Sequence, residues 1–334
     1  GDPVTTVLPC AILPGPFPIS ARKTYGHISD GMICSERELR LGDDHDGIMV
    51  LDRIFPADEL PEPGTDLIPL LGLGEEVVEV NVTPDRGYCF AVRGLARELA
   101  LSTGYDYVDL GLPEAISQGI PGGGDSDDDV FLVEVDPESV LEGRAASDRF
   151  VTRVVRGIDP QAETPQWMVT RLEQAGMRPL SLPVDVTNYV MLDLGQPLHA
   201  YDLDFAEAPF VVRRAEPEEA FQALDGTELV LSEQDILITD SPDGKRGSRV
   251  VGLAGVMGGL NSEVQPDTTD VVIEAAHFDP VSVARTARRH RLHSESSKRF
   301  ERGVDPALAP VAAARAAELI AEYGGGTIDP VQFD

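Results

Sequence analysis

The feature that most constrains the fold is a nine-residue segment, PGGGDSDDD, at residues 121–129. Its glycines, serine and aspartates cannot bury apolar surface, so we expect a mobile boundary between domains there. The chain has 334 residues, which is more than a single core usually supports. The sequence therefore predicts two or three domains, and its 42% of hydrophobic residues are enough to give each of them a core.

Before this boundary the sequence indicates a small β-rich domain and one helix. Short apolar runs at 4–12 and 47–51, separated by Pro and Gly, are typical of a small, incomplete β-barrel. After a Pro-rich linker at 56–64, the segment VVEVNV at 77–82 alternates apolar and polar residues as a strand does. A helix is expected next, with apolar residues on one face and an end at Gly104.

Beyond the boundary the pattern changes to mixed helices and strands, so the expected fold class is α+β, with a larger mixed α/β domain at this end. A helix is predicted at 164–176, with Thr164 as its cap and Pro165 in the first helical position. An Ala-rich helix at 311–323 is expected to end at a glycine. Strands are predicted at 131–135 and 150–158 and around Phe210, Leu229, Ile236 and Val250.

The charge of the chain is strongly acidic, with one basic exception. The formal net charge of −31 argues against a nonspecific binder of nucleic acid. Within this acidic chain, the segment at 284–306 carries seven of the 27 Lys and Arg residues. Charge alone leaves two interpretations open: a positioned contact with phosphates or carboxylates, or a solvated helix end with its own ion pairs. The seven are Arg285, Arg288, Arg289, Arg291, Lys298, Arg299 and Arg302.

Several classes of protein are disfavoured. No apolar run approaches the length of roughly 18 residues that crosses a bilayer, so we expect no membrane partner and a cytoplasmic location. Cys10, Cys34 and Cys89 are few and far apart, which indicates reduced, structural thiols. No metal-binding motif is present, so no metal ligand is predicted. Because the chain starts without Met inside an apolar segment, we expect it to be a piece of a longer protein.

Two segments place polar side chains in apolar surroundings, where they need partners. Residues 184–202 hold Asn188, Gln196, His199 and Asp202, which could orient a ligand or water, or could end a helix with a satisfied histidine. Glu274 follows three apolar residues of a predicted buried strand. It could accept a hydrogen bond from a ligand, or pair with one of the arginines that follow.

A third segment, GLAGVMGGLNSEV at 252–264, is rich in glycine, which allows a backbone to approach a ligand closely. It matches neither a P-loop nor a dinucleotide-binding fingerprint. From the glycines alone, a simple turn between two strands is the favoured interpretation.

Together these motifs resemble one family, the beta subunit of bacterial phenylalanyl-tRNA synthetase. The resemblance rests on five segments in the same order and spacing: VDVTNYVMLDLGQPLHAYD, DGTELVL, GLAGVMGGLNSEV, EAAHFDP and ARTARRHRLHSESSKRFERGVDP. It implies a partial OB-type tRNA-binding domain at 1–55, a small connecting domain at 56–120, a linker with the first strand of the next domain at 121–146, and an editing domain at 147–327.

The resemblance also implies a function, namely support of phenylalanyl-tRNA synthesis and hydrolysis of tyrosine wrongly attached to tRNA(Phe). The expected partners are tRNA(Phe) and the alpha subunit, in a heterotetramer of two alpha and two beta subunits. ATP and Mg²⁺ would serve the full enzyme, and this piece would carry no cofactor. No DNA partner is expected.

By residue, the resemblance assigns an editing pocket. His199 and Asn188 would lie near the scissile ester, and Glu274 would read the tyrosine hydroxyl. Gly258 would form a wall of the pocket. The pair of small residues, commonly Thr and Ala in the family, falls on Ser294 and Ser296.

The basic segment then takes a double role. Arg289 and Arg299 are expected to guide the tRNA end, and the arginines also to serve as counter-charges for buried acids such as Glu274. Two other readings stay open: a non-catalytic tRNA-docking and subunit-interface scaffold with a degenerate pocket, and a free-standing editing or tRNA-modifying protein.

Overall fold

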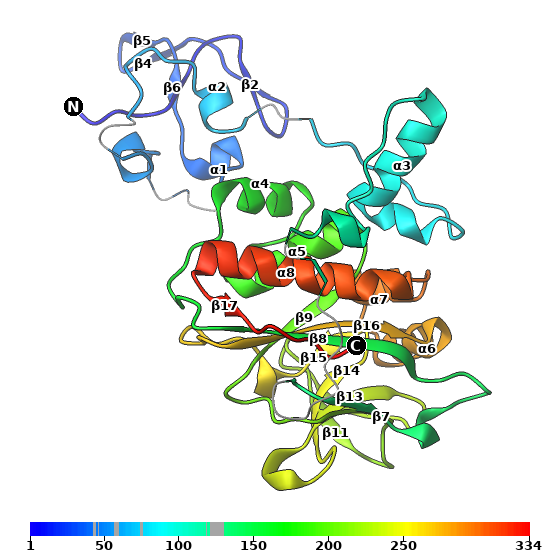
Figure 1. The fold of residues 1–334 in the computed structure, drawn as a ribbon. Helices are drawn as coiled ribbons and strands as arrows, with labels where there is room; N and C mark the ends of the chain where they lie inside the picture. The colour runs from blue at the N-terminus through cyan, green and yellow to red at the C-terminus, as the bar shows by residue number, and fades with distance from the viewer. Residues whose placement is uncertain (43–44, 46, 57–59, 74–75, 118, 121–129) are drawn as a thin grey trace. The chain divides into compact units, whose positions relative to one another are not determined.

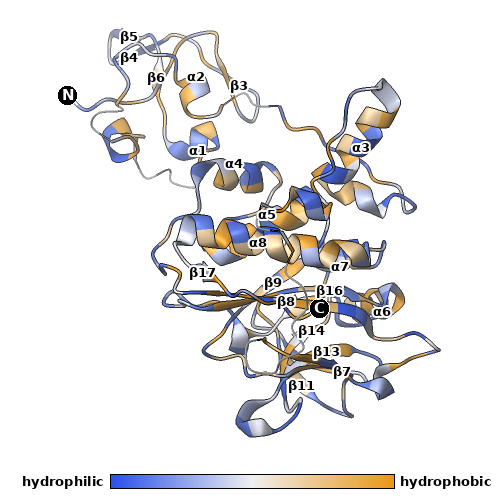
Figure 2. Ribbon diagram, in the orientation of Figure 1, coloured by the Kyte–Doolittle hydropathy of each residue, from blue (hydrophilic) through white to orange (hydrophobic). Residues whose placement is uncertain are grey.

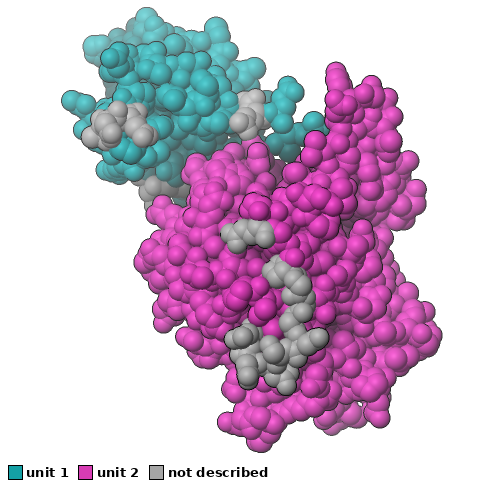
Figure 3. All heavy atoms as spheres, in the orientation of Figure 1, with its two compact units in different colours: residues 1–79 teal, residues 80–334 magenta. Residues whose placement is uncertain are grey.

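The computed structural model describes residues 1–42, 45, 47–56, 60–73, 76–117, 119–120 and 130–334. The predicted boundary at 121–129 lies outside the described residues. By its contacts the chain divides into two compact units, residues 1–79 and 80–334 (Figure 3). The fold is mixed α and β, as predicted.

The first unit is built of short strands around a small core. Its strands form three separate two-stranded antiparallel sheets, and in the part of this unit that the structure describes they do not close into a barrel. The core contains Leu13, Ile19, Cys34, Leu39, Met49 and Leu51. The sheets pair β1 (Thr6–Val7) with β6 (Met32–Ile33), β2 (Ile12–Leu13) with β3 (Phe17–Pro18), and β4 (Arg22–Thr24) with β5 (His27–Ser29), beside the short helices α1 (Glu36–Leu39) and α2 (Leu67–Leu70).

The segment at 77–82 shows that alternation alone does not make a strand. The prediction of a strand there is wrong, because these residues have no regular structure. Val77 and Val78 are 63% and 78% exposed, so neither face of the segment is buried. Without a partner strand the extended backbone gains no ladder of hydrogen bonds.

The second unit has three layers, which Figure 1 shows as helices above two stacked sheets. The middle layer is a four-stranded antiparallel sheet in the order β17-β8-β16-β9. Its strands are β8 (Ser147–Arg156), β9 (Leu198–Asp202), β16 (Val271–Phe278) and β17 (Thr327–Ile328). Successive side chains of β16 pack alternately into the two neighbouring layers, because successive side chains of a strand face opposite sides of the sheet.

One face of this sheet is covered by helices α4 (Gln166–Gln174), α5 (Leu182–Leu194) and α8 (Ala309–Gly324). Helix α8 is apolar along most of its length (Figure 2) and ends at Gly325, as predicted for the Ala-rich segment. Val271 and Ile273 of β16 pack into this helical layer. Before the predicted boundary, helix α3 (Val92–Thr103) of this unit ends at Gly104, also as predicted.

The opposite face packs on a five-stranded sheet in the order β15-β14-β13-β10-β7, in which only the β10–β7 pair is parallel. Val272 and Ala276 of β16 belong to the core between the two sheets. A hairpin of β11 (Ala220–Gln222) and β12 (Glu228–Val230) adjoins it. The five strands are β7 (Val133–Val135), β10 (Phe210–Arg214), β13 (Ile236–Asp240), β14 (Arg249–Leu253) and β15 (Met257–Gly258).

Helix α4 begins one step later than predicted. Pro165 takes the cap position, with a ψ angle of 139°, and the first helical residue is Gln166. Thr164 does not cap the helix, because its hydroxyl donates to Asp185 at 2.6 Å. Asp185 is a buried carboxyl of α5 that also accepts from the backbone of Leu180, so a tertiary partner has displaced the local one.

Candidate functional site

The predicted pocket residues meet around one cavity of about 210 Å³ in the second unit. They come from α5, β9, the β14–β15 loop, β16 and α7 (Glu295–Phe300), which are far apart in sequence. All six residues assigned to the pocket line this cavity: Asn188, His199, Gly258, Glu274, Ser294 and Ser296.

The pairing of two strands brings the main polar groups together. Strands β9 and β16 run antiparallel with His199 opposite Glu274. Directly opposed residues on neighbouring strands share a face of the sheet, so both side chains lie towards the second sheet. Tyr201 is two residues beyond His199 on the same face, and its hydroxyl donates to Glu274 Oε2 at 2.6 Å.

Glu274 is a buried carboxyl, 7% exposed, and among the described residues it forms no ion pair with an arginine. Burial raises its pKa from 4.5 to about 7, and the hydrogen bond from Tyr201 opposes that rise. The expectation that an arginine neutralises Glu274 is therefore wrong. In the described part of the chain its partner is a neutral hydroxyl, which leaves the carboxyl able to titrate near neutral pH.

His199 offers an unengaged nitrogen at the cavity. Its Nε2 is buried and has no hydrogen-bond partner among the described residues. Burial lowers the pKa of His199 from 6.5 to about 4, so its imidazole is neutral at pH 7. A buried polar atom without a partner is costly, and a ligand or water in the cavity would relieve that cost.

The position of the His199 imidazole leaves no room for a side chain at Gly258. A Cβ added to Gly258 would lie 2.6 Å from His199 Cε1 and 2.8 Å from Nε2, which is closer than carbon atoms can pack. The glycine-rich segment is a turn between β14 and β15, and it also forms one wall of the cavity. The two interpretations of this segment, a turn between strands and a backbone close to a ligand site, thus apply to the same residues.

The two serines hold that turn in place. Ser294 is the N-cap of α7, accepting from the backbone of Ser297, and its hydroxyl donates to the carbonyl of Val256 at 2.7 Å. The Ser296 hydroxyl donates to the carbonyl of Gly255 at 3.1 Å. Both hydroxyl hydrogens are therefore engaged by the backbone, and only the oxygen lone pairs can meet a ligand.

Only part of the polar set at 184–202 gathers at the cavity. Asn188, on α5, lines it and has no side-chain hydrogen bond in the described part of the chain. Gln196 is fully buried and donates to the carbonyls of Pro197 and Ala276. Asp202 lies on the opposite face of β9 from His199 and accepts from Thr268, so these two do not join the pocket.

The basic segment is mostly engaged in ion pairs. Arg289, in α6 (Pro280–His290), pairs with the buried Asp235. The Arg299 side chain, only 4% exposed, pairs with Glu295 at 2.7 Å and donates to the carbonyl of Phe90 at 2.6 Å. These contacts support a role in holding α6 and α7, and a tRNA contact by either arginine stays a prediction. Arg288 is the most exposed of the ion-paired arginines here, at 72%.

Sequence reasoning did not single out Tyr201 or Asp235. Tyr201 follows His199 by two residues in a predicted strand-like segment, so alternation could have placed both on one face. Asp235 accepts from Thr286 at 2.8 Å and His290 at 2.6 Å as well as from Arg289, and it stands far from them in sequence. Nothing local could have indicated that cluster.

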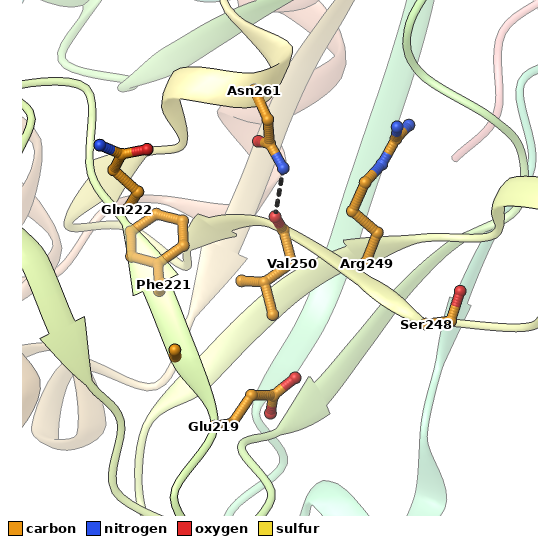
Figure 4. A pocket seen from close by; sticks show the side chains of 8 residues that line it. Glu219, Phe221, Gln222, Ser248, Arg249, Val250 and Asn261 are labelled. Atoms are coloured by element: carbon orange, nitrogen blue, oxygen red, sulfur yellow. Dashed lines mark hydrogen bonds between the residues drawn. The ribbon is translucent and has the colours of Figure 1, made fainter.

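A second, larger cavity of about 430 Å³ lies beside β11 and β14 and contains none of the predicted residues. Its charged side chains, Glu219 and Arg249, are paired within the protein itself. Glu219 pairs with Arg213 at 2.6 Å, and Asn261 donates to the carbonyl of Val250 at 3.1 Å (Figure 4). Within the described residues, no three His, Cys, Asp or Glu side chains are grouped so that they could hold a metal ion.

No helix in the described part of the chain is long and apolar enough to span a membrane.

The chain is similar to phenylalanine–tRNA ligase beta subunits. It is 53% identical to that of Bifidobacterium longum (strain NCC 2705) over 98% of this chain and 38% of the relative. It is 52% identical to that of Leifsonia xyli subsp. xyli over the same shares, and 49% identical to that of Nocardia farcinica over 100% of this chain and 37% of the relative.

The resemblance seen in the sequence motifs is therefore confirmed, and the chain spans somewhat over a third of the length of these relatives. The family model of the B3/4 domain matches residues 146–325. This match covers more than half of the chain and includes the whole cavity between β9, β16 and α7. The chain thus belongs to the B3/4 domain family.

Proposed function

We propose that this chain is the proofreading part of a phenylalanine–tRNA ligase beta subunit and hydrolyses tyrosine wrongly attached to tRNA(Phe). The observation that carries the proposal is the buried carboxyl of Glu274, which faces a cavity together with the unengaged nitrogen of His199. A carboxyl in that setting suits a ligand with a hydroxyl group and disfavours one without it.

The need for such a site follows from the limits of binding. A hydrophobic pocket that accepts phenylalanine rejects an analogue with one added hydroxyl by only about a hundredfold. A second pocket that requires the hydroxyl can select tyrosine over phenylalanine. Glu274 would accept a hydrogen bond from tyrosine, whereas phenylalanine would leave the buried carboxyl short of a partner at a cost of about 1–3 kcal/mol.

The hydrolysis needs an oriented water more than a strong base. His199, with its pKa near 4, is a weak base, so we assign to its Nε2 the task of holding the water by a hydrogen bond. The water oxygen bonds to the ester carbonyl carbon, and the bond from that carbon to the terminal ribose oxygen breaks. The ribose oxygen takes up a proton, which yields free tyrosine and tRNA, with the neighbouring terminal hydroxyl assisting. Asn188 would hold the ester from the side of α5.

In the whole ligase, this chain would work beside modules that it does not include. We propose an alpha subunit partner, in a heterotetramer of two alpha and two beta subunits, which uses ATP and Mg²⁺ to charge tRNA(Phe) in the cytoplasm. We further propose that residues 1–55 belong to a partial OB-type tRNA-binding domain, 56–120 to a connecting domain, 121–146 to a linker and first strand, and 147–327 to the editing domain.

Deacylation of Tyr-tRNA(Phe) and Phe-tRNA(Phe) tests the proposal, with the chain alone and within the complete synthetase. We expect the unmodified protein to prefer Tyr-tRNA(Phe), and Glu274→Ala to lose that preference by about tenfold. Glu219→Ala is the matched control, because it removes a half-buried carboxylate from the other cavity. Glu219→Ala should keep the preference.

Two results would contradict the proposal. Equal, negligible hydrolysis of both substrates by the unmodified synthetase would favour a scaffold with a degenerate pocket. A Glu274→Ala variant that still prefers Tyr-tRNA(Phe) would remove Glu274 from the reading of the hydroxyl.

A further inference from the structure

Tyr201 stands behind the carboxyl that the proposed function uses. It is 1% exposed, and its hydroxyl donates to Glu274 Oε2 at 2.6 Å. Its ring meets the imidazole of His199 edge-on, with ring centres 4.4 Å apart, and meets Phe210 in the same way at 4.9 Å. One side chain therefore contacts both Glu274 and His199.

The position of Tyr201 follows from the register of the sheet. His199 and Tyr201 are alternate residues of β9, so they face the same side, and Glu274 lies opposite His199 on β16. The hydroxyl of Tyr201 lies close to the backbone of Gly252, where an added Cβ would be 3.7 Å from it. Tyr201 thus lines the cavity, and its oxygen reaches the Glu274 carboxyl from the side of Gly252.

This contact leaves Glu274 with one oxygen for a ligand. Oε2 accepts from Tyr201, and no other hydrogen bond to the Glu274 side chain occurs in the described residues. The end of a glutamate side chain turns about a soft torsion, so a single fixed hydrogen bond decides which way the second oxygen faces. Without that bond the carboxyl could still lie in the pocket but would have no set direction.

We propose that Tyr201 is a positioning residue for tyrosine selectivity, which holds one oxygen of Glu274 so that the other accepts the hydroxyl of the substrate. The proposal rests on the proposed function and deepens it. Tyr201 itself need not touch the substrate.

The charge state of the pair supports this role. Burial, together with the neighbouring Glu274, raises the pKa of Tyr201 well above its ordinary range, so its hydroxyl stays a donor. Its hydrogen bond works against the burial that raises the pKa of Glu274. Removing the hydroxyl should therefore raise the pKa of Glu274 further, and the ionised acceptor would form only at higher pH.

The test is Tyr201→Phe in the complete synthetase, which removes one oxygen and keeps the ring. We expect kcat/KM for Tyr-tRNA(Phe) to fall about tenfold and that for Phe-tRNA(Phe) to change little. The acid limb of the pH profile for Tyr-tRNA(Phe) should move to higher pH. A change in packing alone would not move that limb.

Tyr189→Phe is the matched control, because it also removes a hydroxyl that holds a hydrogen bond, from Arg171 at 3.1 Å, but it lies outside the cavity. It should leave selectivity and pH profile as they are. In a Glu274→Gln background the added Tyr201→Phe change should cost much less than it does alone, since the two residues act through one contact.

The inference would be overturned by a Tyr201→Phe enzyme with unchanged selectivity and pH profile. It would also be overturned by an equal loss of hydrolysis for both substrates at an unmoved acid limb, which would mark a purely structural residue. An unmodified synthetase that does not hydrolyse Tyr-tRNA(Phe) would refute the proposed function itself. The two failures can therefore be told apart.

Discussion

Gly258→Ala adds a single methyl group at the wall of the cavity, and the structure indicates what it would meet. The new Cβ would lie 2.6 Å from Cε1 and 2.8 Å from Nε2 of His199, and 2.9 Å from Cδ1 of Leu224. Carbon atoms pack best at about 3.5–4.0 Å, so the imidazole has to move by about 1 Å. The ring of Tyr201, edge-on at 4.4 Å between centres, limits its retreat.

The size of the effect can be worked from this geometry. Forcing one extra methyl group into a packed site costs about 1–3 kcal/mol of the free energy of unfolding. The lower entropy of the unfolded chain with alanine returns about 0.4–1 kcal/mol. Catalysis should suffer more, because a displacement of about 1 Å in a positioning group can reduce a rate by about a hundredfold.

Deacylation of Tyr-tRNA(Phe) and urea unfolding measure the two effects separately. Gly252→Ala is the matched control, since its Cβ would lie 3.6 Å from the carbonyl of Met257 and 3.7 Å from the Tyr201 hydroxyl, which are ordinary contacts. We expect Gly258→Ala to lose far more activity than stability and Gly252→Ala to lose little of either. A Gly258→Ala protein that hydrolyses as fast as the unmodified one would refute the role given to His199.

Two further predictions concern charge. Because the folded pKa of Glu274 is about 7, above its ordinary 4.5, its contribution to stability is full below pH 4.5 and is lost as the pH rises through 7. The free energy of unfolding of Glu274→Gln, relative to that of the unmodified protein, should therefore rise by about 3 kcal/mol from about pH 4 to about pH 8, as measured by urea unfolding. The same difference at both pH values would contradict the raised pKa of Glu274. Asp235→Asn should destabilise the protein by about 1–3 kcal/mol, because the buried carboxylate that accepts from Arg289 and His290 is lost. An unchanged urea midpoint would show that this cluster contributes nothing.

The elements that sequence predicted well are those whose signal is local. The Ala-rich pattern of α8 and the apolar run before Glu274 reflect the period of a helix and the burial of a strand. The incorrect predictions concern residues whose structure depends on partners that are distant in sequence. The segment at 77–82 has the alternation of a strand but no partner, and Thr164 has the position of a cap but bonds to Asp185 instead.

The pocket shows the same division. Its six residues could be assigned from the resemblance of the motifs, and the cavity brings all six together. The partner of Glu274 could not be assigned in this way. Charge suggested an arginine, yet the arginines pair with Asp235 and Glu295, and the hydroxyl on Glu274 comes from a tyrosine 73 residues away.

The sequence by itself determined the fold class, three helices and most strands of the second unit, and the family of the chain. Only the tertiary structure decided which polar groups meet, because that depends on the register between β9 and β16 and on the helices that cover them. A pattern of residues records the face that each segment buries. It does not record the distant strand or helix that buries it, and the partners of His199, Tyr201 and Glu274 follow from that choice.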